Sequence, residues 1–105
     1  SIRTGQTMAA TLAASTYTAL TVAHQSGQIT DVQWQKFQAV WDRYKTANQL
    51  LGTAIAAWDA GIGKPTVERL LALLDSLNAI ITDINALIDA WHIKTAQVPI
   101  VRGRA

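Results

Sequence analysis

The sequence predicts an all-α protein, an elongated up-down-up three-helix bundle in which the second and third helices pack as in a coiled coil. Three observations predict this fold: two long apolar repeats of helical period, a capping box at the start of the first repeat, and breaks rich in glycine and proline around both. At 105 residues the chain has the size of one domain with one core.

The two apolar repeats advance in alternating steps of three and four residues. Such steps place the side chains on one stripe of a helix, the seam of coiled-coil-like packing. The first repeat consists of Trp34, Phe37, Trp41, Tyr44, Asn48, Leu51, Ile55 and Trp58. The second consists of Val67, Leu70, Leu74, Leu77, Ile81, Ile84, Ile88 and Trp91. We expect the two stripes to face each other, with Trp41 and Trp58 in the core.

The start of the second helix carries the clearest local signal. Thr30 and Gln33 have the spacing of a capping box, and Ile29 and Trp34 occupy the positions of a hydrophobic staple. Gly27, just upstream, is expected to cap the first helix, which is rich in alanine and threonine. The first two helices should therefore cover about residues 5–25 and 30–59.

Glycine and proline mark the limits of the third helix. Gly61 should cap the second helix, and Pro65 should open the third, which is expected to run to His92 or Lys94. Pro99 prevents a helical continuation. We therefore expect one helical-bundle domain over residues 1–94, followed by a tail over residues 95–105 that is either extended or disordered.

The composition points to a protein partner. Half of the residues are hydrophobic and only 15% are charged, so part of the apolar surface should be covered by copies of the chain or by another protein. The formal net charge of +2 reflects arginines in the two tails, Arg3, Arg102 and Arg104, and a charge of this kind argues against nucleic-acid binding.

The alanine- and threonine-rich stretch over residues 4–26 falls short of a membrane-spanning segment. Membrane contact is therefore expected only through an anchor preceding Ser1. The chain contains no cysteine, which excludes disulfides and thiolate metal sites and leaves the compartment open.

Two histidines and two aspartates are expected at one end of the bundle: His24, His92, Asp31 and Asp89. These residue types can bind zinc or transfer protons, but no metal-binding spacing is present, and each histidine suits a helix C-terminus electrostatically. The segment over residues 61–64 lacks the pattern of a phosphate-binding loop. We therefore predict no enzyme, no catalytic or metal-ligating residue, no cofactor and no small-molecule substrate.

The candidate interface residues are Trp34, Asn48, Trp91, Arg102 and Arg104. The two tryptophans lie near the bundle end and suit either the core or a contact surface, and the two arginines suit either an acidic partner or solvent. Asn48 occupies a core-type position level with Asn78. It either bonds to Asn78 or a water inside a monomer, in which case Asn48→Leu should stabilise the fold, or it sets the register across a subunit interface.

The stretch over residues 17–44 carries a resemblance. The run Ala23-His24-Gln25-Ser26-Gly27-Gln28-Ile29-Thr30-Asp31 leads into Gln33-Trp34 and then Phe37, Trp41 and Tyr44. This pattern resembles small helical proteins encoded by tailed bacteriophages and prophages, some of which are exported and lipid-anchored while others are virion or accessory components. No functional residue is carried over from the resemblance.

Two hypotheses follow. The first is a structural or assembly protein of phage or prophage type that packs against itself or another protein, in the virion or the bacterial host cell. The alternative is a periplasmic or membrane-anchored accessory domain acting in lysis or superinfection exclusion.

Overall fold

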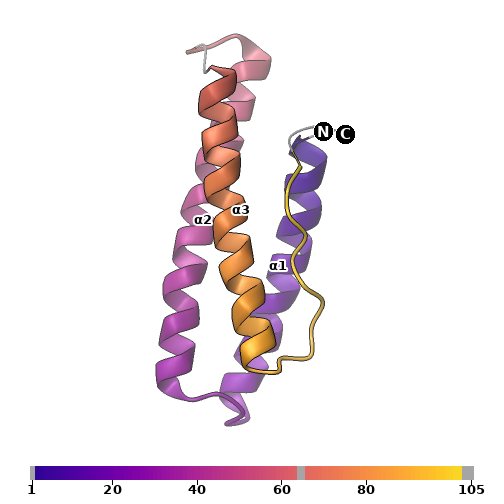
Figure 1. Ribbon diagram of the computed structural model, residues 1–105, viewed down its shortest axis with the longest axis vertical. Coiled ribbons are helices and arrows are strands. Elements are labelled where there is room, and N and C mark those ends of the chain that lie inside the picture. The colour runs from indigo at the N-terminus through magenta and orange to yellow at the C-terminus, as the bar shows by residue number, and fades with distance from the viewer. Residues whose placement is uncertain (1, 64–65, 103–105) are drawn as a thin grey trace.

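The computed structural model describes residues 2–63 and 66–102, and within them the chain forms three α-helices and an extended C-terminal segment (Figure 1). The helices are α1 (Ile2–Gln25), α2 (Asp31–Ala60) and α3 (Val67–Ala90). Successive helices run in opposite directions, in a body of 49 × 23 × 17 Å. The predicted elongated three-helix bundle is confirmed, and α2 and α3 form its most extensive helix pair.

Threonines cap the N-termini of α2 and α3. At Thr30 the full capping box is present: Gln33 N donates to Thr30 Oγ1 at 3.1 Å, and Thr30 N donates to Gln33 Oε1 at 2.8 Å. Thr66 caps α3 by accepting a hydrogen bond from Arg69 N at 3.0 Å. The predicted opening of this helix by Pro65 lies outside the described residues.

All three helices end in the same hydrogen-bonded turn, the Schellman motif. Its left-handed residue is Gly27 after α1 (φ 79°), Gly61 after α2 (φ 67°) and His92 after α3 (φ 53°). After α3, Ile93 N donates to Ile88 O at 3.0 Å and His92 N donates to Asp89 O at 3.3 Å. α3 therefore ends at Ala90, before the expected His92 or Lys94, because the backbone reverses at His92.

Half of the predicted α2 stripe and most of the predicted α3 stripe are buried. The buried members are Phe37, Tyr44, Leu51 and Ile55 on α2, and Leu70, Leu74, Leu77, Ile81, Ile84 and Ile88 on α3. The expectation that Trp58 belongs to the core is wrong, because its side chain is 48% exposed, and Val67 is 52% exposed. Trp58 is in the last turn of α2 and Val67 begins α3, and these ends of the two helices extend past the start of α1 (Figure 1).

α1 buries small residues in its first half and contacts α2 through an aromatic ring further along. Ala9 and Ala13 are fully buried, which fits the close approach that small side chains allow. Further along, the Tyr17 ring lies 4.9 Å from the Trp41 ring and 5.9 Å from the Trp34 ring, centroid to centroid. Two tryptophans of the α2 stripe therefore contact α1, although the repeat alone predicted that they would face α3.

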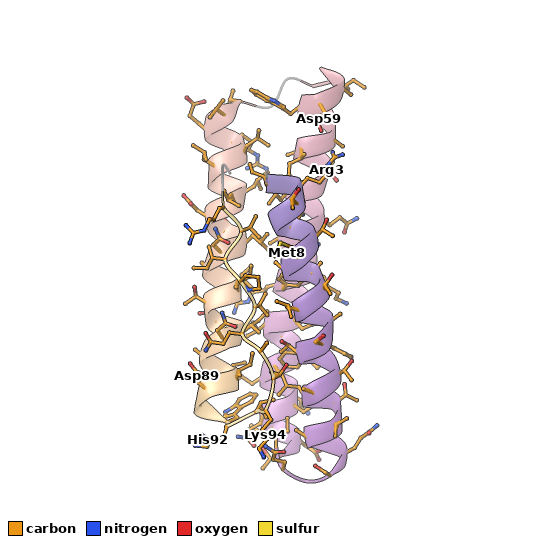
Figure 2. The ribbon with its side chains drawn as sticks, turned by 90° about the vertical axis from the view of Figure 1, so that its right-hand side faces the viewer. Arg3, Met8, Asp59, Asp89, His92 and Lys94 are labelled. Carbon is orange, nitrogen blue, oxygen red and sulfur yellow. The ribbon has the colours of Figure 1, made fainter. Side chains whose placement is uncertain are left out.

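Within the described residues, the backbones of α1 and α3 stay apart, with no Cα atoms of the two helices within 8 Å of each other. The extended segment 93–102, which we call the strap, runs back between them from the end of α3 toward the start of α1 (Figures 1 and 2). Its apolar side chains Ile93, Val98 and Val101 are buried. The strap thus supplies the core between two helices that would otherwise leave a groove.

Candidate functional site

Two asparagines of α3 hold the backbone of the strap. Asn85 Nδ2 donates to Val98 O at 2.9 Å, and Val98 N donates to Asn85 Oδ1 at 2.8 Å. Asn78 repeats the arrangement with Val101: Nδ2 donates to the carbonyl and Oδ1 accepts from the N–H, both at 2.8 Å. Each side-chain amide therefore provides the donor and the acceptor that a neighbouring β-strand would provide.

The spacing of the two asparagines matches the spacing of the two valines. Seven residues of helix rise about 10.5 Å, and three residues of extended chain span about 10 Å. Asn78 and Asn85 therefore meet Val101 and Val98 in register, with the strap antiparallel to α3. Each of the two valines is only 1% exposed. At both positions the backbone is therefore hydrogen-bonded by an asparagine while the side chain is buried.

The opposite wall of this groove is α1. A Cβ placed on Gly5 would lie 3.4 Å from Val101 Cγ1 and 3.8 Å from Val101 Cα. The strap therefore lies within van der Waals reach of the α1 backbone at Gly5. At the other end, Gln97 Nε2 donates to both carboxylate oxygens of Asp89, at 2.8 and 2.9 Å, and Gln28 Nε2 donates to His92 O at 3.5 Å. We call the space between α1 and α3 the strap groove.

A second feature is an exposed apolar surface where α2 meets α3. We use the name tip surface for six exposed apolar side chains: Val67, Leu71 and Ile100 line one hollow, Leu50 and Ile62 line another, and Trp58 lies in the last turn of α2. The hollow of about 600 Å³ is lined by Ile2, Val67, Leu71 and Ile100 among others, and the hollow of about 240 Å³ is lined by Leu50, Ile62 and Leu73 among others. Exposed apolar side chains gathered in this way are typical of protein contact surfaces.

The tryptophans proposed as interface residues lie at the other end of the bundle. Trp34 is half-buried, and the ring of His24 stacks on it with centroids 4.9 Å apart and planes within 4°. Trp91 is half-buried at the end of α3, next to the start of the strap. Both rings thus combine contact with the core and partial exposure.

Asn48 does not pair with Asn78, so that expectation is wrong. Its partner is Gln6 on α1, whose Nε2 lies 2.8 Å from both the side-chain and the backbone oxygen of Asn48. A Cβ on Gly52 would lie 3.7 Å from this Gln6 nitrogen, at ordinary van der Waals distance, so Gly52 lies beside the pair. Asn78 is instead committed to Val101 of the strap. The error arose because the repeat cannot show that α1 flanks this side of α2.

The arginines near the two ends of the chain differ in their surroundings. Arg102 is exposed at the end of the strap and lines the larger hollow of the tip surface. Arg104 lies outside the described residues. Arg3 forms an exposed ion pair with Asp59, at 3.0 Å, which links the start of α1 to the end of α2 (Figure 2). Exposed pairs of this kind contribute at most about 1 kcal/mol.

The histidines and aspartates at the far end do not form one cluster. His24 Nε2 lies 2.7 Å from Asp31 Oδ1, whereas Asp89 binds Gln97 and the His92 carbonyl accepts from Gln28. Within residues 2–63 and 66–102, no three His, Cys, Asp or Glu side chains are grouped so that they could hold a metal ion. Gly61 is a helix cap, and Lys64 of the same loop lies outside the described residues.

Sequence reasoning missed the residues that organise the strap groove. Asn78 and Asn85 are separated by one heptad beside the apolar stripe of α3, and this pair of amides is the signal that could have indicated a backbone ligand. A scan against protein-family models finds no match to this chain, and searches of curated proteins and of solved structures find none either.

Proposed function

We propose that this chain is a non-enzymatic assembly protein that acts by packing against copies of itself or against another protein. The observation that carries the proposal is the tip surface, where six large apolar side chains are exposed and five of them line two hollows. Burial of apolar area contributes roughly 25 cal/mol per Å², so covering this surface would favour association.

A phage or prophage setting is part of the proposal. It is supported by the resemblance over residues 17–44, which includes the Thr30 capping box and the aromatic residues of α2. In that setting the chain would be a structural or accessory component of the virion or of the infected bacterial cell, and its partner would be a protein.

Light scattering over a concentration series tests the proposal, with Leu71→Lys as the disrupting variant. Leu71 is 46% exposed within the tip surface, so a lysine there should lower the association constant at least tenfold while the fold persists. Met8→Lys is the matched control, because Met8 is 58% exposed on α1 outside the tip surface. A chain that stays monomeric at every concentration would contradict self-association. Equal effects of the two variants would contradict the role of the tip.

We propose a membrane-associated accessory role as the alternative, because α3 is long and largely apolar. Among the described residues, α3 (Val67–Ala90) is the one helix long and apolar enough to cross a membrane, by length and composition alone. Core helices of globular proteins meet the same criterion, and α3 also carries a large part of this core. Co-flotation of the chain with anionic lipid vesicles would favour this role. If the chain does not float with the vesicles, the result contradicts the membrane role and favours the assembly role.

A further inference from the structure

The strap groove recognises an extended peptide by its backbone. Asn78 and Asn85 each bind one backbone N–H and one backbone carbonyl, and the residues they bind, Val98 and Val101, are buried. Backbone recognition combined with apolar pockets is also how strand-adding peptides bind to other proteins. The groove is thus a site for an extended segment with apolar side chains at two positions three residues apart.

We infer that in the assembled state this groove takes the strap of a second copy of the chain, so that subunits exchange residues 93–102. The inference rests on the proposed self-assembly. A strap arriving from another copy would make the same hydrogen bonds to Asn78 and Asn85 and would bury the same valines. The closed and exchanged forms therefore differ only in the hinge that joins α3 to the strap and in the entropy of linking two chains.

The hinge at His92 combines a backbone cost that opening relieves with the Schellman hydrogen bonds that opening breaks. His92 occupies the left-handed conformation at φ 53°, whereas glycine takes this position after α1 and α2. Left-handed backbone is costly for a residue with a Cβ, and this cost is released when the hinge straightens. The residue at the hinge is thus strained in the closed monomer.

The balance between the two forms depends on concentration. A short linker gives the chain's own strap an effective concentration on the order of millimolar, so the closed form dominates in dilute solution. Strap exchange competes with the closed form when the local concentration of copies is high. This is the case in an assembly whose subunits already contact each other through another surface. The strap would then join neighbours that the tip surface brings together.

Isotope-filtered NMR on the unmodified chain tests the exchange. Labelled and unlabelled chains are mixed in denaturant, refolded and concentrated to the range in which light scattering shows oligomers. We expect interchain contacts between the Asn85 side-chain amide and the Val98 methyl groups. A discrete oligomer without such contacts would overturn strap exchange while leaving the proposed self-assembly intact, and a monomer at every concentration would contradict both.

Cysteine trapping gives a second readout, since the natural chain has no cysteine. The Gly5 and Val101 positions are close enough for a disulfide, as a Cβ at residue 5 lies 3.8 Å from Val101 Cα. A mixture of the Gly5→Cys and Val101→Cys chains in a glutathione redox buffer should form several times more mixed disulfide dimer than a mixture of Gly52→Cys and Val101→Cys chains. Gly52 faces Gln6 and not the strap, so it reports random collisions.

The double variant Gly5→Cys/Val101→Cys calibrates the trap. In dilute solution this variant should form the disulfide within one chain. That result would verify that residues 5 and 101 are close enough to be linked. Equal dimer yields from the two mixtures, with this disulfide formed normally, would overturn the exchange.

Discussion

Asn85 binds Val98 as a neighbouring strand would, with its amide nitrogen donating to the valine carbonyl and its amide oxygen accepting from the valine N–H. This pairing explains how a chain without β-sheet in its described residues orders an extended segment between two helices. A buried strand carries backbone groups that need partners, and the helix beside it has none of its own backbone groups to offer. Side-chain amides on α3 fill that requirement.

We predict that Asn85→Leu lowers the free energy of unfolding by about 2 kcal/mol, because it leaves the buried N–H and carbonyl of Val98 without partners. Urea unfolding measures the loss, and the amide of Val98 should lose its protection from hydrogen exchange. Gln49→Leu is the control, since Gln49 is an exposed amide on α2, and its effect should stay within about 0.5 kcal/mol. A loss of similar size in the control would refute the role of Asn85.

We predict that His92→Gly raises the free energy of unfolding by about 1 kcal/mol, because glycine adopts the left-handed conformation without the Cβ penalty. Gly27→Ala and Gly61→Ala should lower it by a similar amount. A Cβ at either glycine would meet no atom within 4 Å, so their cost comes from the backbone alone. Thermal unfolding of the three variants should show opposite signs, and a destabilised His92→Gly would contradict this account.

We predict that Gln6 and Asn48 are energetically coupled across α1 and α2. A double-mutant cycle with Gln6→Ala and Asn48→Ala should give a coupling energy of about 0.5–1.5 kcal/mol, because each single variant already removes their shared hydrogen bond. For the same reason Asn48→Leu should not stabilise the fold, as it would if Asn48 only filled the core. Strict additivity in denaturant unfolding would show that this contact contributes nothing.

We predict that Tyr44→Phe raises the free energy of unfolding by about 1 kcal/mol at neutral pH. The Tyr44 hydroxyl is buried and has no hydrogen-bond partner among the described residues, so its removal relieves a desolvated polar group. Denaturant unfolding at pH 7 measures the gain, and a clear loss would show that the hydroxyl is satisfied in solution.

Tyr44 should also make stability depend on alkaline pH. Burial raises the pKa of Tyr44 above the ordinary value of 10.0. The hydroxyl is protonated in both states below pH 10, and above it the unfolded chain ionises first, so stability falls as the pH rises through the folded-state pKa. The natural chain should therefore lose stability faster than Tyr44→Phe between neutral pH and pH 11. Parallel pH profiles of the two proteins would contradict this assignment.

The sequence alone determined the helices and the seam between the second and the third. Apolar steps of three and four residues specify a buried stripe wherever the chain folds, and Thr30 and Gly27 act on backbone groups only a few residues away. Such short-range signals can be interpreted from the sequence because the interacting groups are close together along the chain. They did not extend to His92, where a left-handed turn is formed by a residue that rarely adopts it.

The tertiary structure alone decided which residues meet across the bundle. These contacts depend on which face of each helix is covered by its other neighbours. They are the bond between Asn48 and Gln6, the contacts of Tyr17 with Trp34 and Trp41, and the binding of the strap by Asn78 and Asn85. A periodic pattern identifies the apolar face of a helix but not the segment that packs against it. An apolar side chain is removed from water equally well by a helix and by an extended segment. The segment that packs there is selected by hydrogen bonds between residues far apart in the chain, and these exist only once the groove between α1 and α3 has formed.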